Sequence, residues 1–372
     1  MNLNRLVLSH FRNYEDLDVL FSPGMNVICG ENAQGKTNLL EAAAYLSRAR
    51  SHRARGDKEL ISFDSDFSVI RGDVFARNRE FIVEARLFRA GQKRLLVNGV
   101  RQKTAAGLSG ALRTVLFCPE DLNLILEGPA VRRKFLDGSL CQLRPRYSEA
   151  LVRYNRSLEQ KTRILRDFGE KPSLLETLDA FNRELAKAGA VLMFYRARYV
   201  KKLSKAASAI HFDCSGGREE LHLAYETVKT VKDQMEPPEQ LFSHMMERLD
   251  ALGPAELSAR SCLVGPHRDD ISAEINGKSA RSFGSQGQVR TAALSLKLAE
   301  RDIHYEDMGE HPVLLLDDVL SELDSRRQEF VLNRIAGGQV FLTCCETEPL
   351  RALREGASFR VQNGRVTAAR EP

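Results

Sequence analysis

One short segment constrains this chain more than any other. Residues 30–37, GENAQGKT, match the pattern G-x-x-x-x-G-K-[ST], with an apolar run typical of a strand before them and a helical pattern after them. In that context the backbone N–H groups of the loop and of the helix start bind phosphate oxygens. Lys36 is expected to reach the β- and γ-phosphates, and the Thr37 hydroxyl to bind Mg²⁺. The segment therefore predicts an α/β fold with a nucleotide site.

A second segment supports this interpretation. Residues 313–318, VLLLDD, read as a buried strand that ends in two acids, the form of a Walker B element. Asp317 would hold the Mg²⁺ shell, and Asp318 would position or activate the attacking water. Such a strand is weak evidence alone and strong evidence when paired with residues 30–37. The following Ser321-Glu322-Leu323-Asp324 is, as a local feature, only a helix-start signal.

A third segment, residues 284–288 (GSQGQ), precedes a helical pattern of apolar residues. Ser285 and Gln288 fit a capping box, which accounts for both residues without any function. It does not account for the flanking Gly284 and Gly287. It also does not account for the order of the motifs along the chain: phosphate loop, long insertion, this loop, acidic strand, and Ser-Glu-Leu-Asp.

The secondary-structure pattern changes twice along the chain. The pattern of residues 1–128 indicates strands with a few helices. After Gly128-Pro129, residues 129–254 are expected to be mostly helical. Residues 255–372 are expected to form strands and helices again. Within the helical part, residues 210–214 (IHFDC) and 221–225 (LHLAY) look like strands, and a helix is expected near 238–251. Residues 261–265 (SCLVG) mark the return of strands. Hairpin turns are expected at Asn98-Gly99, Asn276-Gly277 and Asn363-Gly364.

Positive charge is concentrated in the helical part. Residues 130–205 hold 18 Lys and Arg against 8 Asp and Glu, a balance of +10, so the rest of the chain sums to −5 of the total +5. Such asymmetry indicates a polyanionic partner, or else a solvated helical surface. Few aromatic residues accompany the basic runs, which favours contact with a duplex backbone over stacking on single-strand bases.

The cysteines and the apolar runs indicate the compartment. The seven cysteines include no Cys-x-x-Cys pair, and Cys29, Cys118 and Cys344 lie in apolar stretches typical of buried thiols. We expect a reducing cytoplasm with no disulfide framework and no zinc site. No apolar run approaches the length of a membrane span, and the first residues do not read as a secretory signal.

The order of the motifs resembles that of the ATP-binding-cassette ATPases, in the branch of SMC-type heads. Residues 285–288 match their signature motif and residues 321–324 match their D-loop. The resemblance is closer to the RecF family of bacterial recombination mediators, and it extends over essentially the whole chain. The segments that carry it are FRNY (11–14), PEDL (119–122), RRKFLD (132–137), GPHRDD (265–270) and SQGQ (285–288).

This resemblance implies an architecture. The fold would be an ABC-type P-loop ATPase head with an inserted helical lid domain and no long coiled coil. Its domains would be an ATPase part at 1–128, the helical insertion at 129–254, and a second ATPase part at 255–372. The phosphate loop of one subunit would face the signature loop of another, so that two ATP molecules are sandwiched and hold a homodimer together.

The resemblance also implies roles for individual residues. Arg12 and Asn13 would lie near the phosphates, Ser285 would contact the γ-phosphate in trans, and Asp324 would contact the partner subunit. Lys36, Asp317 and Asp318 would be catalytic, and Thr37 and Asp317 would hold Mg²⁺. The residues expected to bind the nucleotide are Arg12, Asn13, Gly30, Glu31, Asn32, Ala33, Gln34, Gly35, Lys36, Thr37, Asn38, Ser285, Gly287, Gln288 and Asp324.

The implied function is an ATP-gated DNA-binding dimer. ATP would close it on DNA at gaps or single-strand/double-strand junctions. The helical insertion and residues 48–58 are candidates for backbone contact, and within the insertion the expected residues are Arg153, Arg156, Lys161 and Arg163. Proteins like RecR and RecO would then help to load RecA in repair and replication restart. ATP hydrolysis to ADP and phosphate would be slow, because Asp318 is one methylene shorter than the usual glutamate. The alternatives are a P-loop small-molecule kinase and a transporter-type ATPase subunit.

Several residues keep more than one interpretation. Thr343 occupies the region where ABC ATPases carry a switch histidine, and its role stays open. His267 reads as structural, in a turn between two strands, or as a catalytic base. Arg268 would reach phosphate or Asp270. Residues 52–55 (HRAR) would contact DNA, contact nucleotide, or form a solvated loop.

Overall fold

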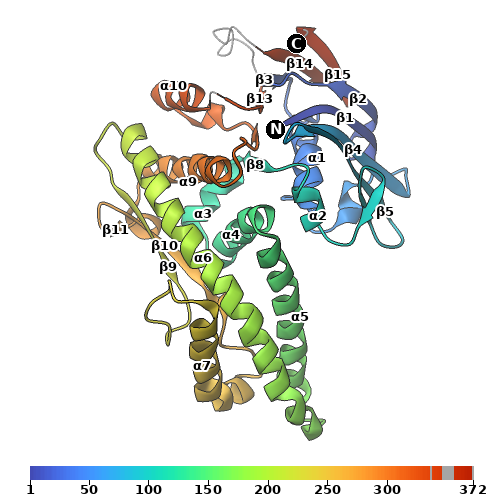
Figure 1. The fold of residues 1–372 in the computed structure, drawn as a ribbon. Helices are drawn as coiled ribbons and strands as arrows, with labels where there is room; N and C mark the ends of the chain where they lie inside the picture. The colour runs from blue at the N-terminus through green and yellow to red at the C-terminus, as the bar shows by residue number, and fades with distance from the viewer. Residues whose placement is uncertain (336, 346–355, 371–372) are drawn as a thin grey trace. The chain divides into compact units, whose positions relative to one another are not determined.

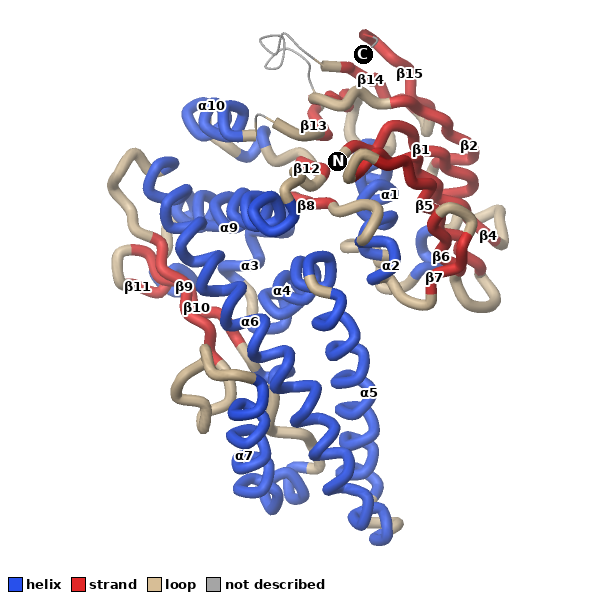
Figure 2. Tube along the Cα trace, in the orientation of Figure 1, coloured by secondary structure: helices blue, strands red, loops and turns tan. Residues whose placement is uncertain are grey.

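The protein consists of two compact units. The computed structural model describes residues 1–335, 337–345 and 356–370. Unit 1 combines Met1–Leu122 with Leu296–Pro372, and unit 2 is Asn123–Ser295. Figure 2 shows that strands dominate unit 1 and helices dominate unit 2. Two segments far apart in sequence therefore build unit 1 around an insertion.

A six-stranded, mostly parallel sheet carries the sequence motifs of unit 1 (Figure 1). Its strand order is β15-β14-β3-β13-β12-β8, and all neighbours except β14 and β15 run parallel. The central strands are buried apolar runs, as parallel sheets covered on both faces require. Their bounds are Met25–Cys29 (β3), Thr114–Phe117 (β8), Val313–Leu316 (β12), Val340–Cys344 (β13), Ala357–Gln362 (β14) and Arg365–Arg370 (β15).

An antiparallel sheet with the order β2-β1-β4-β5-β6-β7 completes unit 1. Buried apolar residues of both sheets and of helix α1 (Lys36–Arg48) form one core cluster, which includes Leu6, Tyr45 and Phe341. The strands are Asn2–Phe11 (β1), Tyr14–Leu20 (β2), Phe67–Ala76 (β4), Arg79–Phe88 (β5), Arg94–Val97 (β6) and Val100–Gln102 (β7). Shorter elements are Asp57–Leu60 (η1), Ala106–Ser109 (α2), Pro119–Leu122 (η2), Leu320–Glu322 (η5) and Ser325–Arg334 (α10).

Unit 2 is built around a long helix, α6 (Leu178–Cys214), which packs against α5, α7 and strand β9. The other helices are Asn123–Leu126 (α3), Pro129–Leu143 (α4), Pro145–Asp167 (α5), Pro172–Thr177 (η3), Pro238–Ala259 (α7), Pro266–Arg268 (η4) and Ala280–Phe283 (α8). A small sheet has the order β11-β10-β9, with bounds Lys278–Ser279, Asp270–Ile275 and Leu221–Glu226. Helix α9 (Gln286–Met308) begins in unit 2 and ends in unit 1.

The division of the chain differs from the predicted domains on the carboxyl-terminal side. Residues 255–295 were expected in the ATPase part, whereas contacts within the chain group them with unit 2. The reason is the pairing of β10 with β9 along the whole length of both strands. A pairing partner 44 to 54 residues away cannot be read from local pattern, because strands select partners through tertiary packing.

Two predicted strands are wrong. Residues 210–214 form the end of α6, where Leu203, Ala207, Ile210 and Cys214 continue one buried helical face. Residues 261–265 form no strand, because their backbone groups bond to side chains instead of a ladder. The Leu263 N–H donates to the Glu256 carboxylate at 2.7 Å, and the Cys262 carbonyl accepts from Arg268 at 3.0 Å. The three predicted hairpin turns are confirmed by strand pairing on either side of each.

Buried ion pairs hold unit 2 together and use several of its basic residues. Arg132 forms two hydrogen bonds with Asp270, at 2.6 and 2.8 Å, and Arg196 pairs with Asp137 and Asp269 at 2.8 and 3.0 Å. The segments RRKFLD and GPHRDD therefore meet in a structural network. Because Asp270 is held by Arg132, the Arg268 guanidinium instead donates to the Cys262 carbonyl.

His267 lies beside this network, next to Pro266, whose carbonyl accepts from Arg196 at 2.7 Å. Its Nδ1 is 2.6 Å from the Tyr154 hydroxyl, and burial lowers the pKa of His267 to about 4. It lies in η4, with a strand after it but none before it. These contacts favour the structural interpretation of His267.

Candidate nucleotide-binding site

The phosphate loop, residues 30–37, joins β3 to α1, and its two glycines are required by close contacts. Gly35 has φ of 117°, and a Cβ there would lie 2.6 Å from the Asn13 side-chain nitrogen. A Cβ on Gly30 would lie 2.4 Å from the Val361 carbonyl oxygen in β14. Any larger residue would therefore push the loop away from its neighbours.

The Lys36 ammonium is held inside this loop. Lys36 is buried, and its Nζ donates to the carbonyl oxygens of Gly30 at 2.6 Å and Glu31 at 3.0 Å. The Tyr14 hydroxyl donates to the Gly35 carbonyl at 3.0 Å. The cation thus lies in the concave side of a backbone loop that is suited to phosphate oxygens.

Asparagine and glutamine side chains brace the loop from two turns of unit 1. Asn13, in the β1–β2 turn, donates to the Gln34 carbonyl at 2.9 Å and accepts from Asn38 at 2.8 Å. The Gln34 side chain accepts from the backbone N–H of Asn363, in the β14–β15 turn, at 2.7 Å. These contacts give Asn13 a positioning role beside the loop, and its place near a nucleotide stays a prediction.

The two motif residues expected to hold Mg²⁺ lie together. The Thr37 hydroxyl donates to Asp317 Oδ1 at 3.0 Å. Burial raises the pKa of Asp317, while hydrogen bonds from Thr343 and Thr37 oppose that rise. Among the described residues no group of three or more His, Cys, Asp and Glu side chains could hold a metal ion. Mg²⁺ fits this arrangement because it keeps several waters and needs only one or two protein ligands besides phosphate oxygens.

Thr343 connects both acids of the Walker B segment. Its hydroxyl donates to Asp317 Oδ1 at 2.9 Å and accepts from the Asp318 backbone N–H at 2.8 Å. Asp318 has a left-handed backbone, with φ of 51°, and its carbonyl accepts from the Ser321 hydroxyl at 2.6 Å. Sequence reasoning left the role of Thr343 open. The pairing of β12 with β13 assigns it a positioning role, because it brings the carboxyl ends of both strands together.

Thr343→Val is expected to slow ATP hydrolysis about tenfold, or ~1.4 kcal/mol, because one buried hydroxyl positions both acids. The affinity for ATP should change less, since the hydrogen bonds of Thr343 are to Asp317 and Asp318, and Lys36 and the loop amides would bind the β- and γ-phosphates. Steady-state phosphate release and nucleotide titration measure the two effects separately. Thr343→Ser keeps the hydroxyl and should restore the rate. Equal rates in the Val variant and the wild type would contradict the positioning role.

Arg12 forms an ion pair with Glu41, a buried acid that was not predicted from the sequence. Its guanidinium donates to both carboxylate oxygens of Glu41, at 2.9 and 3.1 Å, and to the Glu59 carbonyl at 3.1 Å. Glu41 also accepts a short hydrogen bond from Ser51. A signal was present: an acid on the apolar face of the helix after the phosphate loop requires a partner. Contact between Arg12 and a nucleotide stays a prediction.

The segment at 52–55 lies beside the first turn of α1. The Arg53 guanidinium donates to the Asn38 side-chain oxygen at 3.3 Å, one residue beyond Thr37. Burial lowers the pKa of His52 to about 4, so His52 is neutral near pH 7. Of the three interpretations left open, this hydrogen bond favours contact of Arg53 with the nucleotide.

The signature loop, residues 284–288, forms the predicted capping box in unit 2. The Ser285 N–H donates to the Gln288 side chain at 2.9 Å, and the Gln288 N–H donates to the Ser285 hydroxyl at 3.3 Å. Ser285 and Gln286 are exposed at the start of α9. This helix start therefore presents the positive end of its dipole to solvent.

Asp324 caps another helix, α10. Its carboxylate accepts from the Arg327 N–H at 3.0 Å and pairs with the Arg327 guanidinium. The helix-start interpretation of residues 321–324 is thus confirmed, and contact of Asp324 with a partner subunit stays a prediction.

A phosphate loop on β3, paired acids on β12 and a capped signature helix after a helical insertion define an ABC-type ATPase head. The sequence model of the RecF/RecN/SMC N-terminal domain family matches residues 2–367. Relatives named DNA replication and repair protein RecF are 41% identical in Bacillus subtilis and 39% identical in Clostridium acetobutylicum, over 98% of this chain and 99% of each relative. The chain therefore belongs to the RecF family.

Solved structures agree with this assignment. The recombination mediator protein RecF-ATP has a TM-score of 0.91 and 36% identity, over 99% of this chain and 97% of that one. An Smc head domain from Pyrococcus furiosus has a TM-score of 0.55 and 16% identity, over 99% of this chain and 95% of that one, which supports the fold alone. The predicted fold class is confirmed, and the described residues form no long coiled coil. None of the described helices has the length and apolar character needed to span a bilayer.

Proposed function

We propose that this protein is an ATP-dependent DNA-binding recombination mediator that dimerises on ATP. The observation that carries the proposal is the contact between Thr37 and Asp317, braced by Thr343, at the carboxyl ends of neighbouring parallel strands. Family membership supports it, since relatives are named for DNA replication and repair and a similar structure is RecF-ATP in the RecFOR pathway. The proposed functional parts are the ATPase segments 1–128 and 255–372 with an insertion at 129–254, although residues 255–295 pack with the insertion in unit 2.

In this proposal each residue of the site has a distinct task. The loop amides and Lys36 bind the β- and γ-phosphates, and Thr37 and Asp317 hold Mg²⁺. When bound there, Mg²⁺ would supply positive charge that offsets the charge of the phosphate oxygens. Asp318 orients the attacking water, slowly because its side chain is short. Ser285 and the start of α9 from a second copy contact the γ-phosphate, since a helix N-terminus favours an anion.

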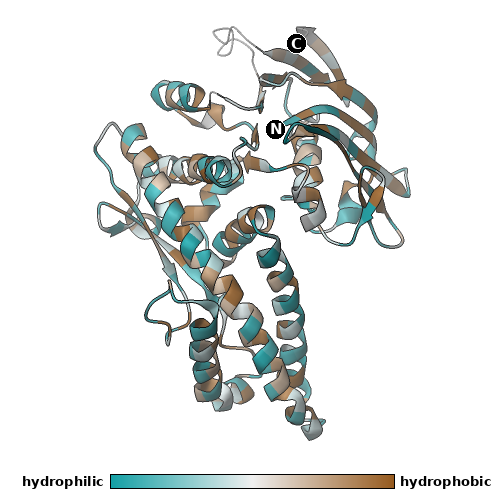
Figure 3. Cartoon of the chain, in the orientation of Figure 1, coloured by the Kyte–Doolittle hydropathy of each residue, from teal (hydrophilic) through white to brown (hydrophobic). Residues whose placement is uncertain are grey.

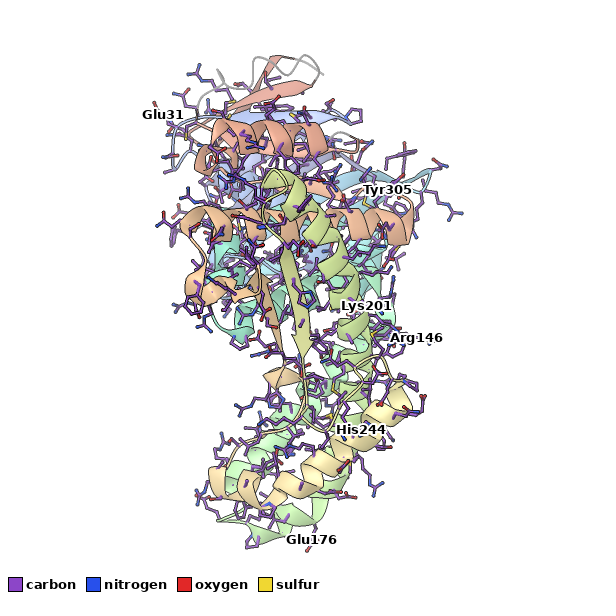
Figure 4. All side chains as sticks on the ribbon, turned by 90° about the vertical axis from the view of Figure 1, so that its left-hand side faces the viewer. Glu31, Arg146, Glu176, Lys201, His244 and Tyr305 are labelled. Carbon is purple, nitrogen blue, oxygen red and sulfur yellow. The ribbon has the colours of Figure 1, made fainter. Side chains whose placement is uncertain are left out.

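The best candidate for DNA contact is a basic stripe on α5, formed by Arg146, Arg153, Arg156 and Arg163. All four side chains are exposed, and their spacing places them within about 100° around the helix axis. Figure 3 shows hydrophilic residues along much of α5, and Figure 4 labels Arg146 among the projecting side chains of unit 2. Lys161 was expected to contribute, and this is wrong. It is fully buried, 2.6 Å from the Glu256 carboxylate.

Replacing Arg153, Arg156 and Arg163 with Gln should weaken DNA binding and flatten its salt dependence. The slope of log K against log salt should fall by up to ~0.9 for each phosphate that the protein no longer neutralises. Anisotropy titrations with a labelled gapped duplex at several salt concentrations measure it. The matched control is Lys171→Gln, Arg183→Gln and Lys187→Gln, exposed cations elsewhere in unit 2. An unchanged slope, or an equal fall in the control, would place the DNA elsewhere.

The remaining parts of the proposal concern partners and compartment. We propose a cytoplasmic protein that acts with proteins like RecR and RecO to help load RecA on gapped DNA, in the response to DNA damage. A gel-shift assay with gapped DNA, with and without ATP, tests the whole proposal. ATP-dependent binding supports it. Absence of DNA binding, with phosphate transfer to a small molecule or binding to a membrane partner, would favour the kinase or the transporter subunit.

A further inference from the structure

Three thiols gather where β3 and β13 end, beside the lysine of the phosphate loop. Cys29 is the last residue of β3, Cys344 is the last residue of β13, and Cys345 follows it. The sulfurs of Cys29 and Cys344 are 3.2 Å apart. Cys345 Sγ is 3.7 Å from Lys36 Nζ and 3.1 Å from the Asn32 side-chain oxygen. Figure 1 shows β3 and β13 side by side in unit 1.

Cys29 and Cys344, here called the thiol pair, are held face to face by the sheet. They are direct register partners on neighbouring parallel strands. A disulfide bond is about 2.05 Å long, so the two sulfurs need to approach by only about 1 Å. Cys29 is buried as predicted, whereas Cys344, expected to be buried, is partly exposed because it lies at the open end of its strand.

The surroundings of Cys29 differ from those of two other buried thiols, Cys118 and Cys262. A hydrogen bond from Cys344 lowers the pKa of Cys29 against the opposing effect of burial, and the Lys36 charge adds to the lowering. In contrast, burial raises the pKa of Cys262 to about 11, and it raises the pKa of Cys118 as well. Thiolate character and access decide which cysteines react. Cys29 therefore has the more thiolate-like sulfur of the pair. The pKa of Cys344 is raised by its hydrogen bond with Cys29 and by burial, so its sulfur is already in position as a thiol.

The pair is also connected to the phosphate loop through the chain itself. Cys29 precedes Gly30, whose carbonyl accepts from the Lys36 ammonium at 2.6 Å. Cys344 precedes Cys345, whose sulfur contacts the same ammonium. A bond that draws the ends of β3 and β13 together thus moves two contacts of the cation that would bind phosphate.

We propose that the thiol pair is an oxidation site, where a peroxide-class oxidant joins Cys29 to Cys344 and the disulfide weakens nucleotide binding at the phosphate loop. The Cys29 thiolate attacks one peroxide oxygen, the O–O bond breaks, and a sulfenic acid and hydroxide result. The Cys344 thiol then attacks the sulfenic sulfur, the S–S bond forms, and the departing hydroxide leaves as water with the Cys344 proton. In sum, two thiols and hydrogen peroxide give one disulfide and two waters.

The test uses the full chain, treated with hydrogen peroxide, quenched with catalase and alkylated before peptide mass mapping. We expect a peptide pair linked through Cys29 and Cys344, reversed by dithiothreitol. Titration with a fluorescent ATP analogue should show affinity about tenfold weaker after oxidation, the size expected for one charge-assisted contact. The reductant should restore it.

Variants separate the pair from the neighbouring thiols. Cys344→Ser should abolish both the link and the oxidative loss of affinity, and Cys29→Ser should do the same. Cys141→Ser, a change outside the cluster, should preserve both effects. If Cys29→Ser does not fold, the test depends on variants of the more exposed Cys344, with Cys344→Ala as a second replacement beside Cys344→Ser. Cys345→Ser should retain the link.

Several outcomes would overturn the proposal. These are a link through Cys345, oxidation of Cys345 alone, or a Cys29–Cys344 link that leaves ATP affinity unchanged. This proposal rests on the proposed nucleotide site, so the ATP affinity of the reduced wild type is measured as well. That value distinguishes a failure of this proposal from a failure of the proposed function. A reduced protein that does not bind ATP would contradict the nucleotide site, whereas the mapped link would still report on the thiol pair.

Discussion

Lys36→Met is expected to abolish the ATP-dependent dimer. Lys36 Nζ lies between the carbonyl oxygens of Gly30 and Glu31, on the side of the loop where the β- and γ-phosphates would bind. A hydrogen bond to a charged group contributes about 1.5–3 kcal/mol, so its loss should weaken ATP binding about 10- to 150-fold. Because bound ATP forms part of the proposed dimer contact, dimers should disappear at ATP concentrations that saturate the wild type. Sedimentation velocity with and without ATP measures this.

The control must separate loss of the ammonium from damage to the fold. Lys58→Met makes the same chemical change at an exposed position of unit 1 and should leave ATP-dependent dimers intact. Circular dichroism and thermal unfolding check the fold of the Lys36 variant, since its buried side chain also braces the loop. ATP-induced dimers that persist unchanged in Lys36→Met would contradict the assignment of the phosphate loop.

Ser285→Arg is expected to block dimerisation while ATP binding to the monomer remains. Ser285 is exposed at the start of α9, and the proposal places it against the nucleotide of the second copy. A long cationic side chain there would occupy the space of the facing phosphate loop and would repel the Lys36 ammonium of the other subunit. Nucleotide titration and sedimentation, performed on the same preparation, separate binding from dimerisation.

Loss of the capping oxygen needs its own control. The Ser285 hydroxyl accepts from the Gln288 N–H, so a replacement that lacks a capping oxygen, such as Ala, costs about 1 kcal/mol at the helix start. Ser285→Ala removes this oxygen without adding bulk. It should reduce dimerisation less than Ser285→Arg. A Ser285→Arg monomer that no longer binds ATP would indicate that Ser285 acts in cis.

Prediction succeeded where local chemistry was sufficient. The loop GENAQGKT, the strand VLLLDD, the capping box at Ser285 and Gln288, and three hairpin turns each depend on residues close in sequence. Prediction was wrong at residues 210–214, where a short apolar run is compatible with both a strand and a buried helix end. It was also wrong for Lys161, because charge composition does not tell an exposed lysine from one paired with Glu256 across 95 residues.

The amino-acid order establishes the chemical elements of the site, namely an anion-binding loop, a lysine, a hydroxyl and two acids, because backbone geometry and residue type act locally. The pairing of strands that are distant in sequence determines which of these residues contact one another. The strand order β3-β13-β12 brings Thr343 between Asp317 and Asp318 and places Cys29 opposite Cys344. No local pattern contains that information, because the partners of a parallel strand are chosen by burial of the whole sheet.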